Sequence, residues 1–249
     1  MAFTLVAWSE SQDTGGVLTN VAAVADQHVT TDGDDVLVPS FAPNLAGVFA
    51  IGATISQAQI SSPTLRKALL YDISPLNIGA EPVTPAYLHD RFRNPIALTP
   101  GEGLRALVAE GAAGAEQDSV FVWLQSEFEE APAGEIITVR ATSTTTLTAY
   151  TWSLCALTLS QQLEAGRYAI VGMKAVSAGA IAARLVIPGS EYRPGVIAAD
   201  SEGDVSVNEQ RYGIHGVFGE FEHTFPPQVE FFSVSADTAE TVYLDLIKL

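Results

Sequence analysis

Histidines are the side chains of this sequence best suited to acid–base chemistry or metal binding. The four are His28, His89, His215 and His223. The densest group of polar residues is His215–His223, which includes Glu220 and Glu222. On a strand, alternate residues share a face, so these two glutamates point to one side while Phe221 and His223 point to the other. Because a metal ion needs ligands that converge on one point, the segment indicates a strand facing solvent or another subunit.

Asp32, Asp34 and Asp35 form a second candidate site, just before an expected strand at Val36–Pro39. Carboxylate oxygens are typical calcium ligands, so the calcium alternative is a site at a subunit seam. The segment lacks the ligand order and the final glutamate of an EF-hand loop, which favours a simple acidic turn. The sequence therefore predicts neither a metal nor a cofactor, with these three aspartates as a weak calcium alternative.

Motifs for nucleophilic, metalloprotease or nucleotide chemistry are missing from the sequence. It contains no Gly-x-Ser-x-Gly, no His-Glu-x-x-His and no Gly-x-x-x-x-Gly-Lys-Ser/Thr. Glu127, Glu129 and Glu130 are typical of a solvated face, and the single Cys155 lies in an apolar run, which predicts a core residue. We therefore expect no catalytic residues and no enzymatic activity. An enzyme on a β-sandwich scaffold remains a third class, because active sites need not carry readable motifs.

Charge and composition exclude two broad classes. The 249 residues include 12 Lys and Arg against 29 Asp and Glu, a net charge of −17, so the clustered cations that grip nucleic acid are missing. Only 16% of residues are charged and 47% are hydrophobic, which excludes an extended disordered chain. No signal peptide or membrane-spanning run is recognisable, so a soluble protein made in a cytoplasm is expected.

Short stretches rich in β-branched, aromatic or alternating apolar residues recur along the chain and predict strands. In the first half they are Phe3–Trp8, Val36–Pro39, Val48–Ile55, Ala68–Tyr71, Leu104–Ala109 and Val120–Leu124. In the second half they are Ile136–Ala141, Leu147–Leu159, Tyr168–Lys174, Ile181–Ile187, Val196–Ala199, His215–Phe218, Val229–Val234 and Val242–Ile247. A weak helical period occurs only at Ser56–Arg66 and Thr84–Phe92. The predicted class is all-β.

An internal repeat divides the chain into halves. The segment Leu45–Gly52 resembles Leu163–Gly172, in which Gly-x-aromatic-Ala-Ile recurs. Three further pairs follow in the same order, namely Arg66 with Arg184, Phe92 with Phe221, and Glu116 with Glu240, at offsets of 118 to 129 positions. The repeat predicts domains at residues 1–130 and 131–249. The second half contains about eight expected strands, and eight antiparallel strands in two packed sheets is the strand count of a jelly roll. The repeat then predicts two tandem jelly-roll β-sandwiches, a double jelly roll.

On this repeat and its architecture, the chain resembles the small double jelly-roll major capsid proteins of tailless icosahedral bacteriophages. The resemblance implies a structural virion protein that assembles as a homotrimer of pseudo-sixfold outline, which tiles an icosahedral shell. It also implies contacts with neighbouring capsomers and other virion proteins, no direct contact with nucleic acid, assembly in the host cytoplasm, and a final location in the virion capsid. Whether a membrane lies beneath the shell is left open.

The alternative function is a tandem β-sandwich that binds carbohydrate, as in a phage spike or adhesin. Trp8, Trp123 and Trp152 would be its candidate sugar-stacking platforms, although all three fall in expected strands and favour core packing. Tyr192 and Arg193 precede Pro194-Gly195 in an expected turn, where an arginine can pair with a carboxylate of a neighbour. Tyr192 and Arg193 are therefore the candidate interface residues.

Overall fold

The computed structural model describes residues 3–13, 15–68, 71–73, 76–77, 89–111, 116–199 and 216–249. Within these residues the regular structure is β-strand apart from one short helix, α1 (Pro63–Ala68). The chain forms two compact units, called here the N-terminal unit (Val6–Ser126) and the C-terminal unit (Met1–Leu5 with Glu127–Leu249). No helix in the described parts of the chain has the length and apolar character needed to cross a membrane.

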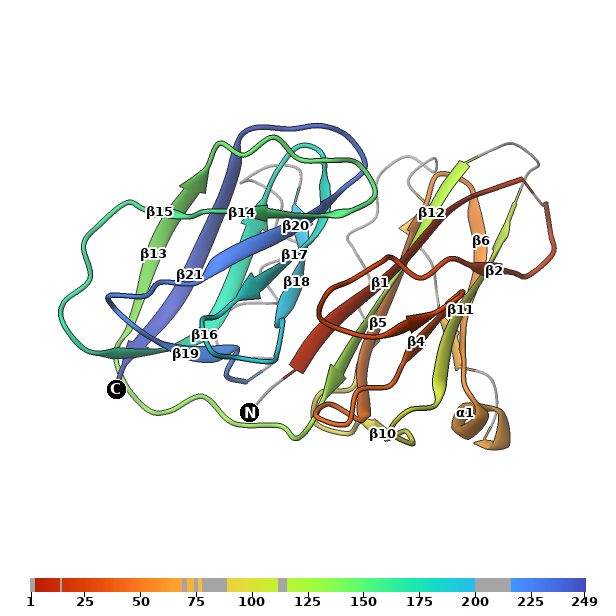
Figure 1. Ribbon diagram of the computed structural model, residues 1–249, viewed down its shortest axis with the longest axis horizontal. Helices are drawn as coiled ribbons and strands as arrows, with labels where there is room; N and C mark the ends of the chain where they lie inside the picture. The colour runs from red at the N-terminus through yellow and green to blue at the C-terminus, as the bar shows by residue number, and fades with distance from the viewer. Residues whose placement is uncertain are drawn as a thin grey trace. The chain divides into compact units, whose positions relative to one another are not determined.

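Two sheets make up the N-terminal unit (Figure 1). The first has the order β1 (Phe3–Gln12), β12 (Glu116–Gln125), β5 (Asn44–Gly52), β10 (Ile96–Ala97), with β8 (Leu76–Asn77) and β9 (His89–Asp90) also paired to β5. The second has the order β3 (Thr31–Asp32), β4 (Asp35–Leu37), β11 (Gly103–Glu110), β6 (Ile55–Ser61), β7 (Tyr71–Ile73), with β2 (Thr19–Val21) paired to β11.

The C-terminal unit contains two corresponding strand rows. One runs β13 (Ile136–Ser143), β21 (Glu240–Lys248), β16 (Arg167–Val176), β19 (Gly219–Glu222), with β15 (Thr158–Leu159) paired to β13. The other runs β14 (Trp152–Cys155), β20 (Gln228–Ser233), β17 (Ala180–Val186), β18 (Gly195–Ala199). Strand β18 also pairs with β16 in parallel, so the two rows join into one curled sheet.

The two units repeat the same strand order. In one row β1, β12 and β5 correspond to β13, β21 and β16, and in the other β4, β11, β6 and β7 correspond to β14, β20, β17 and β18. The strands that connect the two rows are also repeated. In the C-terminal unit, β18 pairs antiparallel with β17 and parallel with β16. In the N-terminal unit, two successive strands share this role, because β7 pairs antiparallel with β6 and β8 pairs parallel with β5. This order is that of two tandem jelly-roll sandwiches, so the predicted fold class is confirmed.

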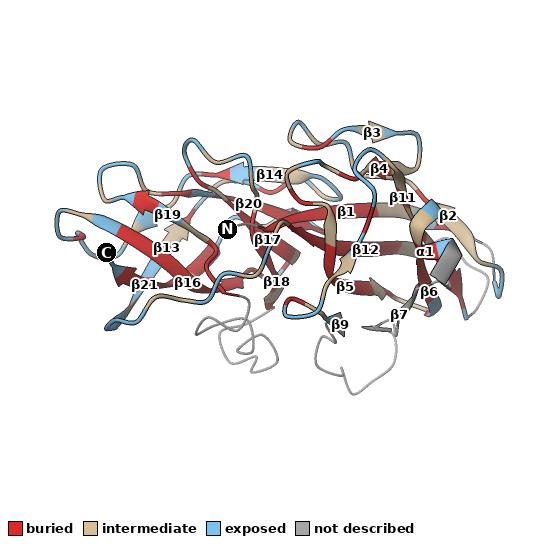
Figure 2. Cartoon of the chain, turned by 90° about the horizontal axis from the view of Figure 1, so that it is seen from below, coloured by how far each residue is buried: buried red, intermediate tan, exposed pale blue. Residues whose placement is uncertain are grey.

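The core of each unit lies on two neighbouring strands, β12 and β5 in the N-terminal unit and β21 and β16 in the C-terminal unit. Strand β12 is buried from Asp118 to Gln125, and β16 from Tyr168 to Val176, as the red strands of Figure 2 show. The aromatic residue of each repeated segment stacks on another ring, although the partners lie on strands that do not correspond. Phe49 stacks on Phe121 of β12 with ring centroids 6.3 Å apart, and Tyr168 stacks on Phe221 of β19 at 5.8 Å. The repeat found in the sequence therefore places a buried aromatic residue on each of the corresponding strands β5 and β16.

Four expected elements differ in the structure. The helical period at Ser56–Arg66 is wrong for its first part, because β6 occupies Ile55–Ser61 and pairs with β11 and β7. A helix follows at α1, where the Ser62 Oγ accepts a hydrogen bond from the Leu65 amide at 3.1 Å, which stabilises the first turn. This helix includes Ala68, so the strand expected at Ala68–Tyr71 is wrong at its start, and β7 begins at Tyr71.

The strand expected at Leu147–Leu159 is divided. Tyr150 has a φ of 59°, a left-handed conformation that interrupts a strand, and the Thr148 amide donates to the Ser153 Oγ at 2.9 Å. Only β14 and β15 form there. The strand expected at His215–Phe218 instead begins at Gly219, and the first residue of that range and most of Thr84–Phe92 lie outside the described residues.

Candidate functional site

The C-terminal unit holds the first residues of the chain in a site built around β18. The Leu5 amide donates to the Arg193 carbonyl at 2.9 Å, and the Arg193 amide donates to the Thr4 Oγ1 at 3.3 Å. The Phe3 ring meets Phe218 edge-on at 5.0 Å. Phe3, Thr4 and Leu5 are all buried. The N-terminal segment Phe3–Leu5 is therefore an integral part of this unit, although the rest of β1 belongs to the other.

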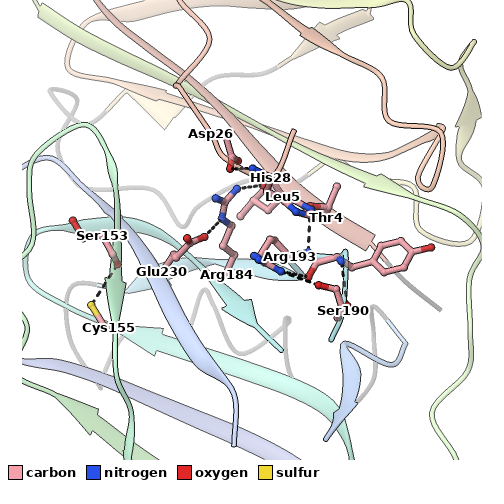
Figure 3. Close-up of polar contacts among 11 residues, drawn as sticks. Thr4, Leu5, Asp26, His28, Ser153, Cys155, Arg184, Ser190, Arg193 and Glu230 are labelled. Atoms are coloured by element: carbon pink, nitrogen blue, oxygen red, sulfur yellow. Dashed lines mark hydrogen bonds and ion pairs between the residues drawn. The ribbon is translucent and has the colours of Figure 1, made fainter. Parts of the chain in front are cut away.

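The buried Arg184 side chain of β17 holds the segment Phe3–Leu5 by a hydrogen bond to the Leu5 backbone (Figure 3). Its guanidinium is 1% exposed, donates from Nε to the Glu230 Oε2 at 2.6 Å, and donates from an NH group to the Leu5 carbonyl at 3.0 Å. The same guanidinium lies 4.1 Å from the centre of the Trp152 ring. A buried cation is tolerated only where such partners satisfy it, so the four residues act as one cluster.

The backbone of β18 at Gly195 lies close to Leu5 of the N-terminal segment and to Ala183 of β17. A Cβ on Gly195 would lie 2.6 Å from the Ala183 carbonyl oxygen and 2.7 Å from the Leu5 Cδ2. Distances this short do not occur for real side chains, so only glycine lets Leu5 pack against β18. The Pro194-Gly195 pair that predicted a turn in the sequence therefore also serves to admit the N-terminal segment.

The two candidate interface residues lie together in the loop that connects β17 to β18. The Arg193 guanidinium donates to the carbonyls of Ser190 and Tyr192 at 3.1 and 3.2 Å, and the Tyr192 amide donates to the Ser190 Oγ at 3.1 Å. Arg193 thus orders its own loop and holds the N-terminal segment through its backbone. Contact of Tyr192 or Arg193 with another subunit stays a prediction.

Tyr192 also lines a cleft of 610 Å³ whose walls carry three carboxylates, from Glu129, Glu191 and Glu220. All three glutamates are exposed. Ile187 forms part of the lining and packs against Gly219, whose φ of 154° disfavours any residue with a side chain. This acidic cleft is suited to binding a cationic group.

A second hollow, of 340 Å³, adjoins the acidic cleft and shares Pro188 and Glu220 with it. Its lining includes Phe225, whose side chain is 66% exposed, and Arg167, which forms ion pairs with Glu220 and Glu222. The expected alternation of β19 is confirmed, because Glu220 and Glu222 are exposed while Phe221 is 6% exposed. Acidic and aromatic surface thus lie side by side.

Two of the three calcium candidates, Asp34 and Asp35, are engaged with protein groups. The Arg105 guanidinium donates to both oxygens of Asp35, at 2.5 and 3.0 Å, and the Asn20 amide donates to Asp34 at 3.2 Å. Asp32 is exposed in the hairpin between β3 and β4. In the part of the chain that the structure describes, no group of three or more His, Cys, Asp or Glu is arranged to hold a metal ion. Calcium binding at Asp35 would have to displace Arg105.

The N-terminal unit contains a buried acidic group that the sequence did not predict. In the sequence its members are only polar residues near the ends of expected strands. Asp118 and Glu110 are fully buried, and the Asp118 carboxylate lies directly over Gly52. Neither oxygen of Asp118 has a hydrogen-bond partner among the described residues. Burial, with smaller contributions from the charges of Glu110 and Glu116, raises the pKa of Asp118 to about 7. A proton is therefore held there near neutral pH.

The tryptophans do not form an exposed sugar platform. Trp8 and Trp123 are fully buried, and Trp152 carries the Arg184 guanidinium on its ring. The prediction of core packing is confirmed for Trp8 and Trp123, and also for Cys155, which is buried. Burial raises the pKa of the Cys155 thiol, which keeps it unreactive.

Comparison with known proteins gives little further guidance. No family model matches the chain, and no curated protein matches its sequence. Among solved structures, the crystal structure of the major capsid protein P2 from Bacteriophage PM2 matches over 99% of this chain and 98% of that chain, with 9% identity and a TM-score of 0.26. A match with this TM-score carries no argument about function, which rests on the residues and topology described above.

Proposed function

We propose that this protein is a major capsid protein, three copies of which form a capsomer of pseudo-sixfold outline in an icosahedral shell. The observation that carries the proposal is the repeated strand order, in which one chain contains two jelly rolls of the same topology. Three copies related by a threefold axis then present six similar sandwiches, so a single gene product can fill a hexagonal position.

The charge of the chain supports the same role. A net charge of −17 suits a shell surface that contacts solvent or other protein and does not contact the genome directly. Trp8 and Trp123 are fully buried and the Arg184 guanidinium covers the half-buried Trp152 ring, which weakens the case for the carbohydrate-binding alternative. Among the described residues, the acidic cleft is one place where that alternative would hold a ligand.

Native mass spectrometry of the purified chain, with negative-stain imaging of the same sample, tests the proposal. We expect a closed trimer of about 79 kDa, three times the 26.3 kDa chain, with a six-lobed outline. A chain that remains monomeric at high concentration across a range of salt concentrations contradicts the proposal. Glycan-array binding by such a monomer would favour the carbohydrate-binding function.

A further inference from the structure

We infer that the acidic cleft and the adjoining Phe225 surface of the C-terminal unit form the contact with a second copy of this chain, and that the cleft receives an arginine from the N-terminal unit of that copy. The inference rests on the proposed trimer and identifies its contact surface. It starts from the three carboxylates of the cleft, Glu129, Glu191 and Glu220.

Glu191 is the carboxylate most in need of a cation. Glu220 is already paired with Arg167 within the unit. Glu191 is exposed on the loop after β17 and makes no ion pair with any residue that the structure describes. A carboxylate at the mouth of a cleft gains most from a charged partner when the cleft is covered, because removal of water strengthens the attraction.

Phe225 provides a second observation that points to a partner. Its ring is the most exposed of the large apolar side chains that the structure describes, at 66%, and it lies beside Pro188 in the adjoining hollow. An aromatic ring next to a charged cleft is the composition of an interface hot spot, since aromatic residues and arginine dominate binding energies at such sites. Burial of this ring by another protein would remove its apolar surface from water.

The scarcity of cations limits what a second copy can supply. Lys and Arg total 12 in the chain, against 29 acidic residues. Among the described side chains of the N-terminal unit, Arg66 and Arg93 are exposed, and the Arg66 Nε also donates to the Ser61 Oγ at 2.9 Å. The Arg105 guanidinium is engaged by both oxygens of Asp35.

In the C-terminal unit, Arg167, Arg184 and Lys248 pair with carboxylates of their own unit, and Arg140 donates to the Thr241 hydroxyl. The arginine is therefore assigned to the N-terminal unit of the neighbouring copy, and a contact between different units is the heterologous arrangement that closes into a ring under threefold symmetry.

Arg66 and Arg93 also lie on neighbouring segments. Arg66 is on α1, and Arg93 is in the turn between β9 and β10. The Thr64 hydroxyl of α1 contacts the Thr99 hydroxyl, just after β10, at 3.2 Å, and Figure 1 places α1 and β10 at the same end of the N-terminal unit. This basic end can therefore present either arginine to an acidic cleft.

Charge reversal within the full-length chain tests the inference. Glu191→Lys should raise the dissociation constant of the trimer on the order of tenfold or more, because like charges then face each other across the contact. Arg66→Glu with Arg93→Glu should weaken the trimer similarly. A chain that carries all three substitutions should recover trimer formation, because every contact again pairs opposite charges. Sedimentation velocity over a dilution series measures each constant.

Two matched controls separate the contact from general surface effects. Glu135→Lys makes the same charge change at an exposed position outside the cleft and should leave the trimer intact. Phe225→Ser should weaken the trimer, whereas Val17→Ser, which removes a 59% exposed apolar side chain from the N-terminal unit, should not. Circular dichroism spectra matching the wild type establish that each variant is folded.

Three results overturn the inference. A trimer unaffected by both Glu191→Lys and Phe225→Ser would place the contact elsewhere, while the proposed function would stand. Loss of trimer in Glu191→Lys without recovery in the triple variant would exclude the arginines as partners. Glycan binding that Tyr192→Ala abolishes, with the trimer unchanged, would make the cleft a carbohydrate site. A monomeric wild type instead overturns the proposed function itself.

Discussion

The Asp118 carboxyl makes the stability of the N-terminal unit depend on pH. Its pKa of about 7 in the folded protein exceeds the value near 4 expected for an unfolded chain. Between these values the folded state holds a proton that the unfolded state has lost, so the free energy of unfolding falls as pH rises through this window and levels off above about 7. The buried carboxyl therefore favours folding in mild acid.

Asp118→Asn should raise the free energy of unfolding at pH 8 by about 1 to 4 kcal/mol and flatten its pH dependence between about 4 and 7, because the amide never ionises. Urea unfolding at several pH values measures both effects. A variant that is less stable than wild type at pH 8, or that keeps the wild-type slope, would show that Asp118 is not the titrating group.

The pKa of Asp237 is shifted in the opposite direction to that of Asp118, so Asp237→Asn serves as a control for Asp118→Asn. Hydrogen bonds from the Ser177 hydroxyl, and from backbone amides including those of Thr238 and Ala178, lower its pKa. Its contribution to stability is present above the pKa of the unfolded chain and is lost as pH falls through the lowered pKa of the folded state. Asp237→Asn should therefore destabilise the protein at pH 7 and lose this effect in acid, which is the reverse of Asp118→Asn.

At the scale of elements, β1 is divided between two units, and its first residues complete the C-terminal unit. Deletion of Met1–Leu5 would expose Phe218 and remove the acceptor that Arg184 finds in the Leu5 carbonyl. Amide hydrogen exchange should then accelerate in β17 and β18, while β11 and β6 of the N-terminal unit keep their protection. Unchanged exchange in β18 would mean that the segment adds nothing to the stability of that strand.

Arg184→Met tests the same anchor without shortening the chain. It should cost about 3 to 5 kcal/mol of unfolding free energy, because Glu230 is left without its buried cation. The double variant Arg184→Met with Glu230→Leu should recover most of this loss, since no charge then lacks a partner. A double variant as unstable as the single one would indicate that packing on Trp152, and not the ion pair, carries the effect.

Sequence patterns predicted the long strands because these bury continuous apolar runs, as in β12 and β16. The repeated pairs Phe49 with Tyr168 and Glu116 with Glu240 lie on equivalent strands. The pairing of Arg66 with Arg184 was wrong, since Arg66 is exposed on α1 and Arg184 is buried on β17. Local patterns do not encode which polar residues meet across strands.

Contacts between strands distant in the sequence were also not predictable at the candidate site. Local chemistry indicated that Tyr192–Pro194 lies in a loop, although the turn of this loop is at Pro188–Gly189 and Gly195 already begins β18. Tyr192 lines the acidic cleft, and the Arg193 carbonyl holds the N-terminal segment. The cluster of Arg184 with Glu230 and Trp152 was not indicated by local chemistry, because its members are brought together by the pairing of β14, β20 and β17. Long-range strand pairing decides these contacts, and one sequence does not reveal it.

At the scale of the whole molecule, two electrostatic effects oppose each other during assembly. Each copy carries a net charge of −17, so copies repel at long range, whereas the inferred contact pairs opposite charges at short range. Added salt weakens the long-range repulsion between copies first, because the Debye length falls from about 30 Å at 0.01 M to about 8 Å at 0.15 M. A partly buried ion pair at the contact is screened less.

Trimer formation should therefore strengthen as salt rises from about 0.01 to about 0.15 M, and the dissociation constant from sedimentation velocity measures this change. Glu135→Lys makes the net charge less negative away from the cleft, so its trimer should be tighter than wild type at low salt and equal to it at high salt. Glu191→Lys makes the same change in net charge but should stay weak at every salt concentration, because it reverses a charge at the contact. If association instead weakens steadily with salt, short-range ion pairs outweigh the repulsion between acidic copies, and the net charge does not govern assembly.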